Sequence, residues 1–186
     1  MAITNGIIDL ERAKEELGSG FPSADGTKLE RFVEAATPVM EDLCKAIVPR
    51  AVTEVVSGGD DILDLRHHVV SITSITDRGT LLIAGTDYHY DAEEDVLYGG
   101  SQLTSSPFAF GRRNLVIVYQ AGYEPIPENL ALATAQLVAH WWRQGRATGR
   151  TKFSGEAGEL VTPSGYGVPN RVFDVSRPHH RLTGIG

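Results

Sequence analysis

The order of apolar and polar positions divides the chain into a helical beginning, a β-rich middle, a second helical stretch and a tail. Apolar residues recur three and four positions apart from about Gly26 to Ile47, which is the spacing of one face of an α-helix. Pro38 lies inside this stretch, and because proline lacks a backbone donor, we expect a kink or a break there. A shorter helix is predicted from Asp9 to Leu17, because Leu10, Ala13 and Leu17 recur at helical spacing and glycines after them provide a stop signal.

Between Pro49 and about Tyr123 the pattern changes to short runs of β-branched and aromatic residues separated by turn residues. Asp77-Arg78-Gly79 fits a hairpin turn, since glycine adopts a positive φ at little cost. The acidic stretch 91–95 is expected at a hairpin tip in water. The spacing predicts a small antiparallel sheet or sandwich with strands at 52–56, 62–65, 69–76, 80–83, 88–90, 96–98 and 115–119.

The strongest helix signal runs from Pro127 to about Gln144, where Leu130, Leu137 and Trp141 form one apolar stripe. Alanines keep the rest of this helix slim enough for close packing. Two adjacent indoles on a helix do not both face one core, so we expect one to be buried and the other to pack on a second element or a neighbouring subunit. On the same helix, His140 is expected to be a packed or interface histidine.

The chain becomes glycine-rich after Gly145 and then keeps apolar residues without a helical or strand period. Such a segment is typical of an extended tail that docks on a partner. The predicted fold class is therefore α+β, with a helical core made of a kinked N-terminal helix and a long C-terminal helix, an inserted small antiparallel β lobe and an extended C-terminal tail. We expect a single domain, 1–186, composed of 1–48, 49–123, 124–146 and 147–186.

Composition indicates an ordinary globular chain, because 41% of the residues are hydrophobic and 22% are charged. No apolar run approaches the roughly 18 residues of a membrane span, and the N-terminus lacks the pattern of a signal peptide. We therefore expect a protein made in the cytoplasm without membrane contact. The single cysteine, Cys44, excludes an internal disulfide and is expected to be a buried small hydrophobe.

The charge is unevenly distributed along the chain. Residues 1–100 carry 19 acidic and 8 basic side chains, whereas residues 101–186 carry 5 acidic and 9 basic ones. Either the basic half meets an acidic surface of a neighbouring copy, a partner or nucleic acid, or the asymmetry belongs to a solvated surface.

No arrangement of residues indicates a catalytic, cofactor-binding or metal-binding site. In the pairs His67-His68 and His179-His180, neighbouring side chains on a strand point to opposite faces, so neither pair is expected to ligate one ion. The acids at 60, 61 and 64 lack a glutamate that closes a calcium loop and are expected to be solvated. Neither a phosphate-binding loop nor a nucleophile elbow is present.

Several segments, in this order, resemble siphophage head-tail connector proteins. In that family a strand ends in an Ala-Gly-Tyr turn, a proline opens a helix, and the helix ends in aromatic residues. The similarity covers most of the chain from about Leu29, although 173–176 is more polar than expected and the loop 145–165 is long. The matching segments are 119–123, 126–130 and 135–142, with a β lobe at 69–75, 81–82 and 87–88, and a tail at 167–172, 177–178 and Arg181.

The resemblance implies a structural virion protein of the phage neck, assembled in the host cytoplasm, without cofactor or catalysis. It forms a ring, expected to be twelve-fold, beneath the portal protein and above a stopper or tail-completion protein, with genomic DNA passing through the lumen unread. The helix 127–144 is expected to supply ring contacts through Leu137, His140, Trp141 and Trp142. The tail is expected to dock on the portal through Val168, Pro169, Arg171, Val172, Phe173, Arg177 and Arg181.

Two other functions remain open at this stage. One is another neck subunit, such as a stopper or tail-completion protein. The other is a small-ligand or carbohydrate-binding β module, which requires Tyr88, Tyr90, Tyr98 and Trp142 to line one pocket. An enzyme is the least favoured class.

Overall fold

The computed structural model describes residues 6–18, 25–147 and 167–180, and these form two compact units. The helical unit combines the described residues up to 44 with those from 126 to 180. The β unit consists of residues 45–125, close to the predicted insertion at 49–123. The mixture of helices and antiparallel sheets confirms the predicted α+β class.

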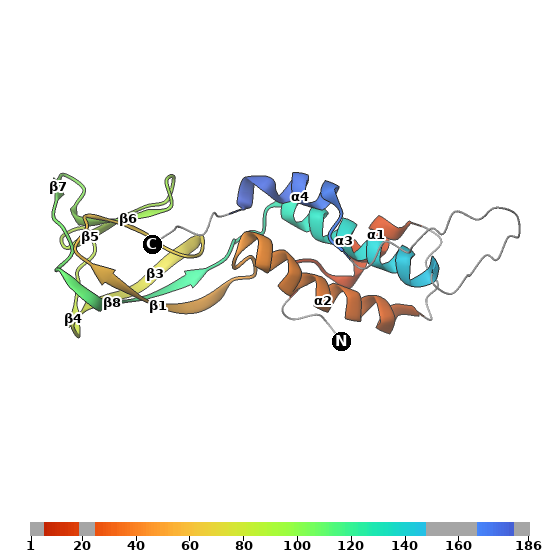
Figure 1. Cartoon of the computed structure of the whole chain (residues 1–186), viewed down its shortest axis with the longest axis horizontal. Coiled ribbons are helices and arrows are strands. Elements are labelled where there is room, and N and C mark those ends of the chain that lie inside the picture. The colour runs from red at the N-terminus through yellow and green to blue at the C-terminus, as the bar shows by residue number, and fades with distance from the viewer. Residues whose placement is uncertain (1–5, 19–24, 148–166, 181–186) are drawn as a thin grey trace, which may run out of the picture. The chain divides into compact units, whose positions relative to one another are not determined.

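In the helical unit, α3 contacts α1, α2 and α4 (Figure 1). None of the helices in the described ranges is both long and apolar enough to cross a membrane. The elements are α1 (Leu10–Leu17), α2 (Gly26–Cys44), α3 (Glu128–Ala147), α4 (Asn170–Ser176) and the 3₁₀ turn η2 (Arg177–His179).

Helices α1 and α2 begin close to their predicted positions, but α2 differs from the prediction in two respects. The Asp9 carboxylate accepts the backbone N–H of Arg12 at 2.8 Å and so caps α1. A kink or a break was expected at Pro38, and because α2 continues through this residue, the break is absent. Helix α2 ends at Cys44 rather than Ile47 because Lys45 adopts a left-handed conformation with φ of 66°, which does not continue a helix.

Helix α3 carries the core of the helical unit. Leu130, Leu137 and Val138 are fully buried, and alanines between them allow the other helices to approach closely. Both Trp141 and Trp142 are buried, with 6% and 4% of their surface exposed, so burial of only one is wrong. The expected packing on a second element is present, because both indoles contact Phe32 of α2.

The C-terminal segment is the main departure from the predicted fold. Residues 170–179 are helical instead of extended, and α4 contacts α3. Val172 and Ser176, one turn apart, are both buried. Such a short helix is marginal by itself, so its packing on α3 stabilises it.

The β unit contains two antiparallel sheets, in the order β1-β8-β3-β4 and β2-β6-β5, with β7 paired to β6. The Arg78-Gly79 turn joins β3 to β4 as predicted, with a positive φ at both residues. The strands are β1 (Arg50–Gly58), β2 (Ile62–Asp64), β3 (Val69–Asp77), β4 (Thr80–Leu81), β5 (Tyr88–Asp91), β6 (Val96–Ser101), β7 (Thr104–Ser105) and β8 (Gly111–Ala121).

The two sheets share one hydrophobic core. Along the central strand β8, alternate residues from Leu115 to Ala121 are buried, which is the period of a strand with one buried face. They pack in one cluster with Ile75 of the same sheet and with Leu97 of the other sheet. The β unit is therefore a small sandwich.

The Ala-Gly-Tyr motif at the end of β8 holds together the segments that enter and leave the β unit. Gly122 has φ of 117°, and a Cβ there would lie 2.9 Å from the carbonyl oxygen of Ile47. The next residue, Tyr123, donates its backbone N–H to the same oxygen at 2.9 Å and stacks on His68 with ring centroids 4.4 Å apart. Only glycine permits this close approach without strain.

The hairpin predicted at 91–95 is present, but Asp95 does not point into water. Its side chain is 13% exposed, and His68 Nδ1 lies 3.0 Å from its Oδ2. The Tyr90 hydroxyl also donates to Asp95, and the Val69 backbone N–H does so at 3.3 Å. Asp95 thus fastens the β5–β6 hairpin to the start of β3.

We predict that Asp95→Ala destabilises the β unit by about 1–3 kcal/mol, because three groups lose their acceptor. Asn at this position retains an acceptor oxygen and tolerates the φ of 59°, so Asp95→Asn is the matched control with a smaller loss. Hydrogen exchange of the Ile117 amide measures the opening of the β unit. Equal protection in the wild type and Asp95→Ala would contradict the role of this carboxylate.

Candidate assembly interface

A groove of about 160 Å³ lies where α1, α3 and the start of α4 meet in the helical unit. It is lined by Glu16, Gln136, His140, Arg143, Pro169, Arg171 and Val172. His140 belongs to the residues predicted to contact a neighbouring copy, and Pro169, Arg171 and Val172 belong to those predicted to dock on the portal. The structure therefore brings members of both sets to one surface.

Several polar groups of this groove have no partner among the residues that the structure describes. Gln136 Oε1 is buried and accepts no hydrogen bond within the described ranges. The side chains of Glu16, Arg143 and Arg171 likewise form no hydrogen bond or ion pair with any described residue. A buried acceptor without a donor costs about 1–3 kcal/mol. The two guanidinium groups favour a carboxylate on a bound segment.

The remaining predicted docking residues differ in exposure. Arg177 is exposed, whereas Val168 is half-buried. Phe173, also half-buried, packs edge-on against His180 with ring centroids 6.2 Å apart. Val172 is 1% exposed because it anchors α4, so it is not available to a partner in this conformation. Arg181 lies outside the described residues.

The residues predicted to form ring contacts on α3 are mostly internal. Leu137 is fully buried, and both indoles pack on Phe32 of α2, with ring centroids 6.5 and 6.2 Å away. The Lys28 ammonium lies 5.4 Å from the Trp142 ring, a cation–π contact. Of these four residues, only His140 is partly exposed.

The adjacent histidines have separate structural partners. His67 Nδ1 accepts the backbone N–H of Ala46 at 3.1 Å, and burial lowers the pKa of this imidazole. His179 contacts Asn129, whereas His180 contacts Ser176. No cluster of three potential metal ligands occurs in 6–18, 25–147 or 167–180.

The tyrosines required for a carbohydrate site have structural roles instead. Tyr88 is buried in the core, and the Tyr98 hydroxyl donates to Glu94 at 2.5 Å. The Tyr90 hydroxyl is engaged by Asp95. A pocket lined by these rings is thus not formed within the β unit.

Sequence reasoning missed Glu16 and Gln136 as part of the surface. The only signal for Gln136 was a neutral amide among alanines and leucines on an otherwise apolar part of α3. Glu16 was indistinguishable from other surface acids, because its position beside α4 depends on a helix that the sequence pattern did not predict.

We predict that Val172→Ala lowers the stability of the helical unit by about 1–3 kcal/mol, since it removes buried methyl groups. Arg171→Ala changes an exposed neighbour and should cost less than about 0.5 kcal/mol. Both tryptophans lie in the helical unit, so tryptophan fluorescence during urea unfolding reports its stability. Equal midpoints for the two variants would show that α4 is not anchored through Val172.

The model of the head completion protein family matches residues 6–182 of the chain. No curated protein matches it. Among solved structures, a chain from the "Neck of empty GTA particle computed with C6 symmetry" is similar, with a TM-score of 0.57 and 17% sequence identity. The similarity covers 97% of this chain and 92% of that chain. At this identity the likeness shows a shared fold.

Proposed function

Because this chain belongs to the head completion protein family, we propose that it is the head-tail adaptor, which forms a ring beneath the portal and joins the DNA-filled capsid to the tail. A head completion protein is a structural component of the virion and not an enzyme. The observation that carries the proposal is the groove between α1, α3 and α4, because its charged side chains, which pair with none of the described residues, suit a segment supplied by another subunit.

The portal-docking surface consists of the exposed side of α4 and the residues before it. Arg171 and Arg177 provide exposed charges, while Val168, Pro169 and Phe173 provide half-buried apolar surface. Val172 positions α4 from the inside. Arg181, the last member of the predicted docking set, lies outside the described residues.

The ring contact uses α3, where His140 lines the groove. The buried side chains of Leu137, Trp141 and Trp142 fix the position of this helix within its unit. The ring contains twelve copies, so that its symmetry matches that of the portal. Genomic DNA passes through the lumen without sequence reading, a stopper or tail-completion protein follows below, and assembly takes place in the host cytoplasm. The similar neck structure was computed with C6 symmetry, which a ring of six copies satisfies as well as a ring of twelve. A stopper-type neck subunit is therefore the second candidate.

We predict that Arg171→Glu/Arg177→Glu weakens binding to the portal about tenfold or more, equivalent to about 1.4 kcal/mol, because it reverses two exposed charges on the docking surface. Light scattering behind a sizing column, with the chain alone and mixed with its portal, measures the complex. Deletion of the whole tail is less informative, because it also removes the buried Val172.

The matched control is Arg31→Glu/Arg66→Glu, which reverses two other exposed arginines. It should leave portal binding unchanged. A wild-type chain that ignores the portal but joins a purified stopper or tail protein would favour the second candidate.

A further inference from the structure

The outer edge of β1 is a long strand edge that no other strand covers in the described part of the chain. β1 pairs with β8 on its inner side only. This pairing is regular from Arg50 to Val56, so no bulge turns that stretch of the edge away. The strand also contains no proline or lysine, the residues that often protect such an edge. An edge with these features pairs readily with a strand of another chain.

Strand β4 forms the opposite edge of the same sheet, and one row of side chains joins the two edges. Directly opposite residues of an antiparallel pair project from the same face of a sheet. Val116 of β8 lies opposite Val55 of β1 and opposite Thr76 of β3. Thr76 in turn lies opposite Leu81 of β4. The row faces away from the core, because Ile117, the next residue of β8, is fully buried.

Both ends of this row are exposed hydrophobic side chains. Val55 is 37% exposed and Leu81 is 62% exposed. A β4 edge placed against the β1 edge of another copy brings these two side chains together and continues the row from one copy into the next. The strands alternate in direction across the sheet, so β4 also has the antiparallel direction that this pairing requires.

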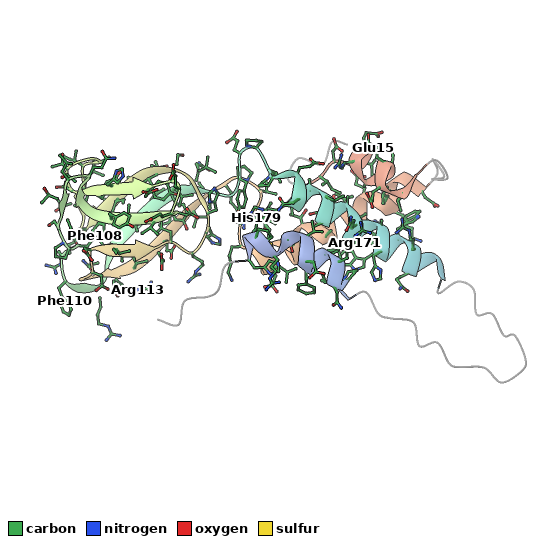
Figure 2. All side chains as sticks on the ribbon, turned by 90° about the horizontal axis from the view of Figure 1, so that it is seen from above. Glu15, Phe108, Phe110, Arg113, Arg171 and His179 are labelled. Carbon is green, nitrogen blue, oxygen red and sulfur yellow. The ribbon has the colours of Figure 1, made fainter. Side chains whose placement is uncertain are left out.

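A groove of about 250 Å³ borders β1 and offers room for side chains of an added strand. The guanidinium groups of Arg66 and Arg113 line it and form no hydrogen bond or ion pair with any described residue. Figure 2 shows the Arg113 side chain extending away from the β unit. The groove also contains the carboxylate of Glu54, whose Oε2 accepts the Arg66 backbone N–H at 3.2 Å and the Tyr119 hydroxyl at 2.9 Å. Two guanidinium groups against one carboxylate favour an additional acidic group.

The β4 edge presents such a group. The side chain of Asp87 is exposed, and its Oδ2 accepts the backbone N–H of Ile83 at 2.8 Å, just beyond β4. Its Oδ1 accepts no hydrogen bond from any described residue. The basic residue of this edge, Arg78, donates to the Phe110 carbonyl of its own copy. Asp87 thus lies beside the segment that would meet β1.

We propose that the β4 edge of one copy of this chain joins the β1 edge of the next copy as an antiparallel strand. Leu81 then covers Val55, and Asp87 faces the groove that Arg66 and Arg113 line. Because the two patches lie at opposite edges of one sheet, the contact is head-to-tail and repeats around a closed ring. The inference rests on the ring of the proposed function and adds a contact between β units to the one through α3.

Disulfide trapping tests this contact. Val55→Cys and Leu81→Cys each place a thiol at an exposed position of one edge, so the core is unchanged. Because directly opposite Cβ atoms lie close enough for a disulfide, an oxidised equimolar mixture should form the mixed dimer at least about tenfold faster than either variant dimerises with itself. The double variant should give a ladder of covalent oligomers. Mass spectrometry of the full-length chains, free and bound to the portal, identifies the products.

Leu103→Cys mixed with Val55→Cys is the matched control for random collisions, since Leu103 is 97% exposed and lies on neither edge strand. The wild type controls for Cys44, which is buried. Equal rates for the Leu103→Cys and Leu81→Cys mixtures would overturn the proposal. So would a single variant that dimerises as fast as the mixture, which indicates a symmetric contact, or a mixed dimer that forms neither free nor on the portal.

The reduced variants should bind the portal normally, because the proposed docking surface lies in the helical unit. Loss of portal binding together with intact cross-linking would contradict the adaptor assignment and leave the contact between β units standing. Normal portal binding without specific cross-linking would have the opposite meaning.

Discussion

The structure depends on one close approach, at the point where the chain enters and leaves the β unit. An insertion of about eighty residues leaves the helical unit intact only if its two ends meet. Gly122 allows this because a side chain there would collide with Ile47 and Pro49. The Tyr123 backbone then bonds to Ile47, and its ring stacks on His68, which is itself tied to Asp95. The Ala-Gly-Tyr motif is therefore a structural requirement of the inserted arrangement, independent of any partner.

The sequence pattern predicted those elements whose environment repeats along the chain. In β8 every second residue is buried, and in α3 the apolar stripe repeats over several helical turns. Such regular repeats can be recognised in the sequence alone. The sequence pattern did not predict helix α4. Only Val172 and Ser176 of its seven residues are buried, and the apolar residues Phe173 and Val175 obscure the helical period. Its stability comes from α3, which is a contact between residues about forty positions apart.

The candidate site was less predictable for the same reason. Arg171 and His140 were named from the resemblance, but the groove that joins them depends on α4, and Gln136 has no distinctive local pattern. Asp95 was predicted to lie in water, because an acid within an acidic run is normally solvated. Its partner His68 lies 27 residues away in the sequence, so the local pattern gave no sign of the contact. The tryptophans were misjudged because Phe32 and Lys28 of α2 extend the core far enough to cover both indoles.

The asymmetry of charge along the sequence becomes two separate surfaces in the structure. Arg112 and Arg113 lie on the β unit beside exposed apolar residues, while Arg143 and Arg171 line a polar groove on the helical unit, where no described large hydrophobic residue is exposed. These surfaces suit different kinds of contact. A polar groove whose charges pair with no described residue favours a partner whose affinity falls with salt, because salt screens hydrated charges. Apolar side chains flanked by both signs of charge favour a contact that buries area and depends less on salt. A neck subunit that is first free and then assembles would use both kinds of surface, the polar groove and the exposed apolar residues of the β unit.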